Sequence, residues 1–104
     1  MNLPDEFDVR LEEGTAVVRP TGELDLATAP ALRAALEHAL RIAERAVLVD
    51  LAAVTFLDST ALAVFVETWR KASDGTVGFR LSRPAPNVRR VLAMTDLTGL
   101  LCPG

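Results

Sequence analysis

Two short segments near the start of the chain alternate between apolar and polar positions. In residues 7–11 every second side chain is apolar, which is the period-two pattern of a half-buried strand. Residues 15–20 form a second extended segment, and the Glu13-Gly14 pair between the two is typical of a turn. The pattern predicts an antiparallel hairpin in the N-terminal part of the chain.

After Thr28 the apolar spacing changes to one residue in every three or four. This segment extends to Ala43 and is rich in Ala, Leu, Arg and Glu, which favour helices. The Thr28 side chain is expected to cap the helix, and Pro30 falls in the first turn, where a missing N–H costs nothing. We therefore expect a helix that begins after Thr28.

A nearly continuous apolar segment, residues 46–51, follows this helix and contains two β-branched valines. Such a segment is typical of a central strand that is covered on both faces. A further strand is expected over residues 76–81, where apolar and polar side chains alternate, and a short helix is expected from Pro86. The tail, residues 98–104, is too short to predict an element.

A second long helix is expected within residues 54–75. Four bulky apolar residues recur there at spacings of three and four and are expected to face the sheet, with the tryptophan as a core residue: Leu62, Phe65, Val66 and Trp69. The residues then expected to point outward are Thr60, Ala63, Val64 and Glu67. Gly75 is expected to end the helix, since glycine tolerates the left-handed conformation of a helix C-terminus.

The expected order of elements is strand, strand, helix, strand, helix, strand, helix. Strands that alternate with helices favour parallel crossovers. The predicted fold class is therefore α/β, with a mixed β-sheet that has an N-terminal antiparallel hairpin and parallel crossovers, and with helices packed on the sheet. The length of 104 residues suits a single domain over residues 1–104.

Composition excludes several classes of protein. A single Cys and a single His leave no disulfide framework, no Cys-based zinc site and no multi-histidine metal site. The net charge of -3 argues against a protein that binds nucleic acid phosphates, and no apolar segment approaches the roughly 20 residues of a membrane span. The N-terminal residues also lack the basic and apolar parts of a signal peptide. We expect a cytoplasmic protein with no cofactor, no metal, no direct nucleic acid contact and no membrane contact.

The sequence Asp58-Ser59-Thr60 precedes the apolar stripe of the second long helix, and free N–H groups and the helix dipole favour anions at a helix start. Either Asp58 or Ser59 is suited to cap the helix. If Asp58 caps it, the Ser59 hydroxyl stays free at the positive end; if Ser59 caps it, the backbone occupies that oxygen. A hydrolase built on Asp58 and Ser59 would lack a base, since His38 stands in another helix and is expected to be solvent-exposed. We therefore expect no enzyme activity.

Three segments resemble, in this order and spacing, the STAS domain of bacterial anti-sigma factor antagonists, also called anti-anti-sigma factors. They are GELDLATAPALRAAL (residues 22–36), VTFLDSTALAVFV (residues 54–66) and NVRRVLAMTDLTGLL (residues 87–101). The resemblance extends from about Phe7 to Leu101, and it implies the STAS fold for this part of the chain.

The resemblance implies a regulatory binding protein. Such a protein binds an anti-sigma factor that is also a serine kinase with the histidine-kinase-like ATPase fold, and binding releases the sigma factor for transcription. Phosphorylation of Ser59 by that kinase would switch the antagonist off, and a phosphatase would reverse the modification. Asp25 is similar to the family residue that lies beside the phosphorylation site.

The partner surface expected from the resemblance and from the helical wheel has six residues: Asp25, Asp58, Ser59, Thr60, Ala63 and Val64. Val64 is included because the wheel places this apolar side chain on the outward face. Ala61 and Ala63 stand where many members carry glycine, and both keep a small side chain. An alternative within the family is an accessory subunit of a transporter or a sensory complex that is not phosphorylated. The intact Asp58-Ser59-Thr60 sequence favours the phosphorylated antagonist.

Overall fold

The predicted hairpin is the first feature of the described part of the chain. The computed structural model describes residues 7–101, so Cys102 lies outside the described residues. β1 (Asp8–Glu12) pairs antiparallel with β2 (Thr15–Arg19). The two turn residues between them, Glu13 and Gly14, have φ angles of 52° and 88°, which is the left-handed backbone that a two-residue hairpin turn requires. The hairpin prediction is confirmed.

The hairpin is part of a four-stranded mixed sheet with the order β1-β2-β4-β6. β4 (Ala46–Asp50) lies between β2 and β6 (Gly78–Ser82) and is parallel to both. Parallel neighbours need long crossover connections, which the helices provide. The predicted α/β class with a mixed sheet, an N-terminal hairpin and parallel crossovers is therefore confirmed.

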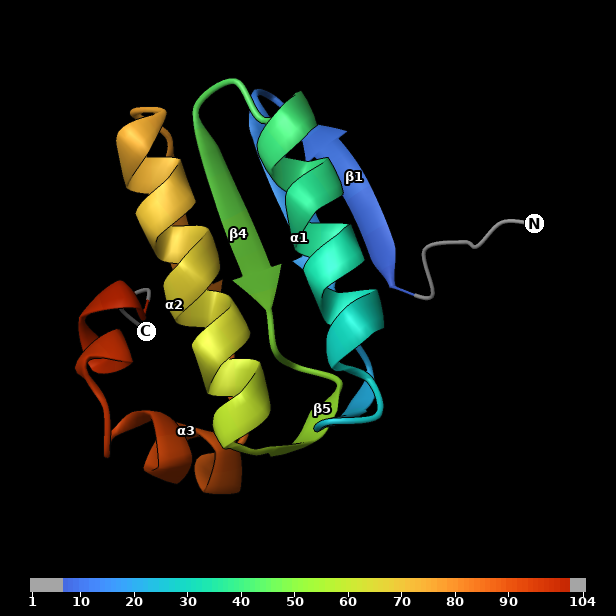
Figure 1. Ribbon diagram of the computed structural model, residues 1–104, viewed down its shortest axis with the longest axis vertical. Coiled ribbons are helices and arrows are strands. Elements are labelled where there is room, and N and C mark those ends of the chain that lie inside the picture. The colour runs from blue at the N-terminus through green and yellow to red at the C-terminus, as the bar shows by residue number, and fades with distance from the viewer. Residues whose placement is uncertain (1–6, 102–104) are drawn as a thin grey trace.

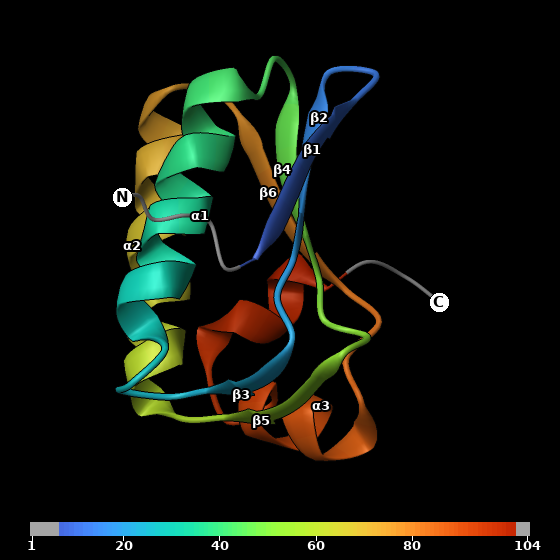
Figure 2. The ribbon, with the colours of Figure 1, turned by 90° about the vertical axis from the view of Figure 1, so that its right-hand side faces the viewer.

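Two long helices cover one face of this sheet. α1 (Ala29–Ile42) and α2 (Ser59–Asp74) lie side by side on that face and run in the same direction (Figures 1 and 2). Alternate residues of β2 and β4 point towards them and belong to the core, including Ala16, Val18, Val47 and Val49. Because both helices pack on one face, their N-terminal ends lie at the same end of the molecule.

Two short strands that the sequence pattern does not predict lie at that same end. β3 (Gly22–Leu24) and β5 (Val54–Leu57) pair in parallel and form a separate two-stranded sheet. Figure 2 shows this pair crossing the molecule below the helices. The second long helix, which was expected to be capped by Asp58 or Ser59, begins at Ser59 as predicted. Strands of three and four residues are too short to show a period of their own.

The C-terminal part packs against these strands. α3 (Pro86–Leu92) contacts β5, and the 3₁₀ helix η1 (Asp96–Leu100) contacts α3 and β6. The short helix from Pro86 is confirmed, whereas η1 was not predicted. Within residues 7–101, no helix has the length and the apolar character needed to cross a bilayer.

The orientation predicted for α2 is wrong. Its buried face consists of five residues: Ala61, Val64, Phe65, Thr68 and Ala72. Val64 is 1% exposed instead of pointing outward, and Trp69 is only partly buried. Glu67 and Lys71 form ion pairs with α1, so the side of α2 that carries Val64 faces its neighbour helix.

Two details of the helix ends also differ from expectation. Thr28 occupies the position before α1, but its side chain makes no capping bond to that helix. Gly75 follows the last residue of α2 with an ordinary φ of -90°, and the next residue, Thr76, takes the left-handed conformation instead, with φ 59°. Both helix boundaries are as expected, although the local bonding is not.

Candidate functional site

The two-stranded sheet brings two distant acidic residues together. Leu24 at the end of β3 pairs with Leu57 at the end of β5, and the Asp58 N–H donates to the Leu24 carbonyl oxygen at 3.1 Å. Asp25 and Asp58 therefore follow paired residues at the carboxyl ends of neighbouring parallel strands. Each of them precedes the N-terminus of a long helix, Asp25 that of α1 and Asp58 that of α2.

Asp58 is the residue that caps α2. Its Oδ1 accepts hydrogen bonds from the N–H of Thr60 at 2.9 Å and of Ala61 at 3.2 Å. Ser59 is the first residue of the helix, is exposed, and makes no side-chain hydrogen bond to any of residues 7–101. Of the two arrangements that the sequence allowed, the structure has the one in which Asp58 caps the helix and the Ser59 oxygen does not.

Asp25 organises the turn that leads into α1. Its Oδ1 accepts from the N–H of Ala27 at 3.0 Å and of Thr28 at 3.2 Å. The Thr28 hydroxyl accepts from the Asp25 N–H at 2.9 Å and donates to the Glu23 carbonyl oxygen at 2.9 Å. Thr28 therefore stabilises the turn in front of the helix, and half-buried Asp25 does so from the other side.

The remaining expected site residues differ in their accessibility. Thr60 is half-buried and Ala63 is exposed, so both are available beside Ser59. Val64 belongs to the hydrophobic core and is not part of this surface. The prediction that Val64 forms an outward contact patch is wrong. It assumed that the bulkiest side chains of α2 mark its buried face, whereas several of them lie at the edge of that face.

Sequence reasoning missed one prominent residue of this surface. Leu26 stands in the turn between Asp25 and α1 and is 75% exposed. In the sequence, Leu26 is an apolar residue that fits neither the spacing of the following helix nor that of a strand. A lone exposed leucine is common on protein surfaces, so the pattern alone gave it no meaning.

The electrostatics of the site favour an added anion. The first turn of α2 contains no acidic residue, and residues 59–66 carry no charged side chain. The unpaired N–H groups and the dipole of a helix start stabilise negative charge by about 0.3–1 kcal/mol at an exposed position. A phosphate on Ser59 would therefore be compatible with the folded helix.

The single histidine lies away from the start of α2. His38 stands in α1 nine residues after Ala29, or about 13 Å along the helix at 1.5 Å per residue, so it does not reach the start of α2. It is half-buried, although a solvent-exposed position was expected. Among residues 7–101 no group of three or more His, Cys, Asp or Glu side chains could hold a metal ion.

Comparison with known proteins identifies the family. The sequence model of the family described as STAS domain matches residues 6–102. The chain is 37% identical over 73 residues to the anti-sigma-F factor antagonist RsfB of Mycobacterium tuberculosis, which covers 68% of this chain and 60% of that protein. It is also 32% identical to the anti-sigma-B factor antagonist of Bacillus subtilis over 102 residues. This match covers 96% of this chain and 86% of that protein.

Solved structures show the same fold. A crystal structure of an anti-sigma factor antagonist from Mycobacterium paratuberculosis matches with a TM-score of 0.84 and 33% identity, over 100% of this chain and 92% of that chain. The unphosphorylated form of the anti-sigma factor antagonist SpoIIAA matches with a TM-score of 0.81 and 23% identity, over 94% and 87% of the two chains. The second likeness supports the fold alone.

Proposed function

Because the chain belongs to the STAS domain family, we propose that it is an anti-sigma factor antagonist. In the unphosphorylated state it binds an anti-sigma factor and thereby releases a sigma factor for transcription in the bacterial cytoplasm. The relatives at 37% and 32% identity, both named as antagonists of this kind, support the proposal. The chain spans only 60% of the length of the mycobacterial relative, so the proposal rests also on the residues of the site.

The observation that carries the proposal is the free hydroxyl of Ser59. Asp58 satisfies the first N–H groups of α2, so the serine hydroxyl at the first helical position remains exposed and unbonded within residues 7–101. The anti-sigma factor is proposed to be a serine kinase of the histidine-kinase-like ATPase type. The Ser59 oxygen attacks the γ-phosphate of ATP, ADP leaves, and the hydroxyl proton passes to a base on the kinase. The chain itself supplies no catalytic group and is not an enzyme.

Phosphorylation would switch the binding off without unfolding the protein. It adds about -1.5 to -2 charges at pH 7, which changes the net charge from -3 to about -5. The start of α2 tolerates this charge, whereas a docked partner would have to desolvate it beside Asp25 and Asp58. A loss of about two decades in affinity, or ~3 kcal/mol, is enough for a switch. A phosphatase that hydrolyses phospho-Ser59 restores the binding form.

The proposal is tested with candidate anti-sigma factor kinases and ATP. We expect mass spectrometry to find phosphate on Ser59 in the wild-type protein and none in Ser59→Ala. We also expect Ser59→Ala to bind the kinase like the wild type, and Ser59→Asp to bind it at least tenfold more weakly. Equal binding by all three proteins, with no phosphate on Ser59, would favour an accessory subunit that is not switched.

A further inference from the structure

Leu26 is the exposed apolar residue closest in the chain to the proposed binding site. Four large apolar side chains among residues 7–101 are at least 46% exposed: Leu11, Leu26, Phe56 and Met94. Of these, only Leu26 stands in the turn between Asp25 and α1. Its side chain is 75% exposed and is not part of the hydrophobic core, so packing within the protein does not account for a leucine at this position.

The turn that holds Leu26 is fixed by its own hydrogen bonds. The N–H groups of Thr28 and Ala29 donate to the Asp25 carbonyl oxygen at 3.2 and 2.8 Å, in addition to the side-chain bonds of Asp25 and Thr28. Any rearrangement that buried Leu26 locally would have to break several of these bonds. The side chain is therefore held outward before any partner arrives, which lowers the entropic cost of docking.

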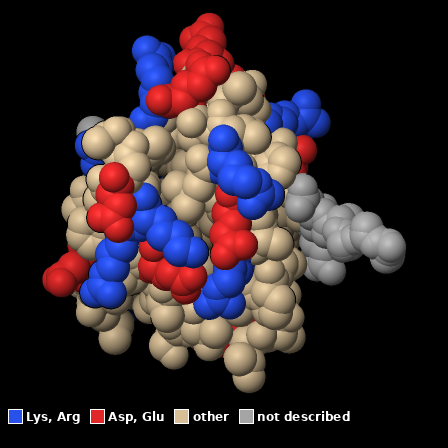
Figure 3. All heavy atoms as spheres, turned by 45° about the horizontal axis from the view of Figure 1, so that its top comes forward, with Lys and Arg blue, Asp and Glu red and all other residues tan. Residues whose placement is uncertain are grey.

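Leu26 directly follows Asp25, but the residues after it and those at the start of α2 are uncharged. No charged side chain occurs in residues 26–32 or in residues 59–66, and the exposed residues there are mostly small, among them Ala27, Ser59 and Ala63. By contrast, acidic and basic side chains intermingle over the opposite end of the molecule, which Figure 3 turns towards the viewer. A leucine that projects from a surface of small, uncharged residues is a convex apolar feature, whose complement is a concave apolar pocket.

We propose that Leu26 is an apolar anchor that inserts into a hydrophobic pocket of the anti-sigma factor, next to the place where that protein receives Ser59. This inference rests on the proposed function and adds a specificity contact to it. The switch and the anchor then act separately. Ser59 decides whether docking occurs, and Leu26 contributes affinity for partners that have the pocket.

The test compares Leu26→Ala with Met94→Ala, using the anti-sigma factor that the wild-type protein binds. Met94 is a matched control because it is 81% exposed and follows α3, which Figure 1 shows on the other side of α2 from α1. Both variants should unfold at the denaturant concentration of the wild type, since neither side chain is buried. We expect Leu26→Ala to raise the Kd about tenfold or more, whereas Leu26→Met should keep most of the wild-type affinity because it keeps a large apolar side chain. Met94→Ala should leave the Kd unchanged.

Each other outcome has a defined meaning. Wild-type affinity in Leu26→Ala, together with weak binding by Ser59→Asp, would overturn the anchor and leave the proposed function standing. An equal loss in the Leu26 and Met94 variants would also overturn the anchor, because the effect would not be local. If the wild-type protein binds none of the anti-sigma factor kinases tested, the proposed function and the anchor both fail.

Discussion

At the scale of single residues, the capping role of Asp58 decides the chemistry of Ser59. The two residues are neighbours with similar capping preferences, and the sequence allowed either to cap α2. In the structure Asp58 has extended backbone angles and accepts from two N–H groups, whereas Ser59 already has a helical position. This division of labour leaves the Ser59 hydroxyl exposed and without a hydrogen bond to residues 7–101, as the proposed phosphorylation requires.

This division of labour predicts different effects of two adjacent alanine substitutions. Asp58→Ala removes the acceptor of two backbone N–H groups and should lower the free energy of unfolding by about 1 kcal/mol. Ser59→Ala removes a side chain without a described bonding partner and should change it by less than about 0.5 kcal/mol. Urea denaturation followed by circular dichroism measures both. A larger loss in Ser59→Ala than in Asp58→Ala would show that the serine is the cap.

At the scale of elements, the orientation of α2 depends on what packs on each of its sides. The helix carries apolar residues around more than half of its circumference, so the largest side chains did not identify the buried face. Small residues such as Ala61 and Ala72 let the helix approach the sheet, and the ion pairs to α1 mark the adjoining side. The result is a rotation of roughly a quarter turn from the orientation predicted by spacing.

Two valines of α2 provide a test of this orientation. Val64 is buried in the core, and Val66 is only partly buried. Val64→Ala should lower the free energy of unfolding by about 1–3 kcal/mol, and Val66→Ala should lower it by clearly less. Both substitutions have the same helix propensity change, so the difference reports burial alone. Equal losses in a denaturant titration would contradict the orientation in the structure.

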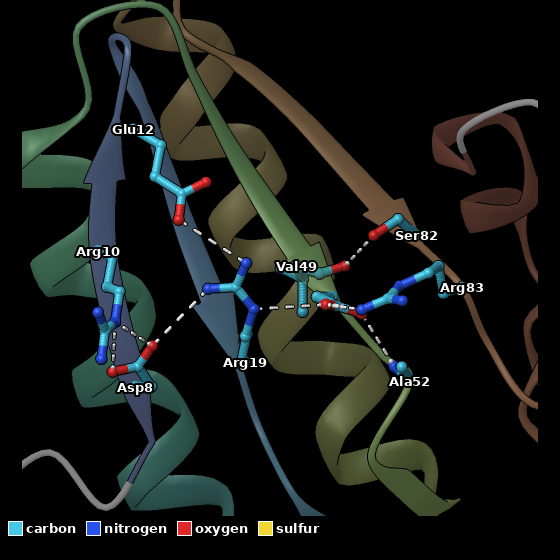
Figure 4. A network of polar contacts seen from close by, with 9 residues as sticks. Asp8, Arg10, Glu12, Arg19, Val49, Ala52, Ser82 and Arg83 are labelled. Carbon is cyan, nitrogen blue, oxygen red and sulfur yellow. Dashed lines mark hydrogen bonds and ion pairs between the residues drawn. The ribbon is translucent and has the colours of Figure 1, made fainter.

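At the scale of the whole molecule, one buried carboxylate ties three strands of the sheet together. Asp50 ends β4 and accepts two hydrogen bonds from Arg83, which follows β6, while the Arg19 Nε of β2 lies 3.5 Å from its Oδ2 (Figure 4). Its Oδ1 also accepts from the Ala52 N–H at 3.1 Å. Asp50 therefore fixes the turn that leads from the main sheet into β5, and so to Ser59.

This network predicts a dependence of stability on acid. The hydrogen bonds from Arg83 hold the pKa of Asp50 below its usual value of 3.8, although burial acts in the opposite direction. A lowered pKa in the folded state means that the stabilisation is complete above about pH 5 and is lost as the pH falls through the folded-state pKa. Asp50→Asn should lower the free energy of unfolding at pH 7 by about 1–3 kcal/mol and should flatten its decrease between pH 5 and pH 2.

The control for this prediction is Glu67→Gln. Glu67 is a partly exposed carboxylate paired with Arg33 and Lys71, and ion pairs near the surface contribute little in water. The control should show nearly the wild-type stability at pH 7. If Asp50→Asn and Glu67→Gln had the same pH profile in urea titrations, the central role of Asp50 would be refuted.

Local patterns in the sequence determined the hairpin, the central strand, both long helices and the short helix from Pro86. They did so because a period of two or of 3.6 residues is visible within a single segment. The segments around Asp25 and Ser59 were likewise recognisable in the chain itself. These features can be recognised without knowing which elements pack against one another.

Only the tertiary structure decided the features that depend on residues far apart in the chain. The pairing of β3 with β5, which places Asp25 beside Asp58, joins segments about 30 residues apart and leaves no local period. The burial of Val64 depends on α1, and the outward position of Leu26 depends on a turn whose bonds involve Glu23, Asp25 and Thr28. Periodicity reports which residues share a face of an element, whereas the neighbours on that face are set by the packing of the whole chain.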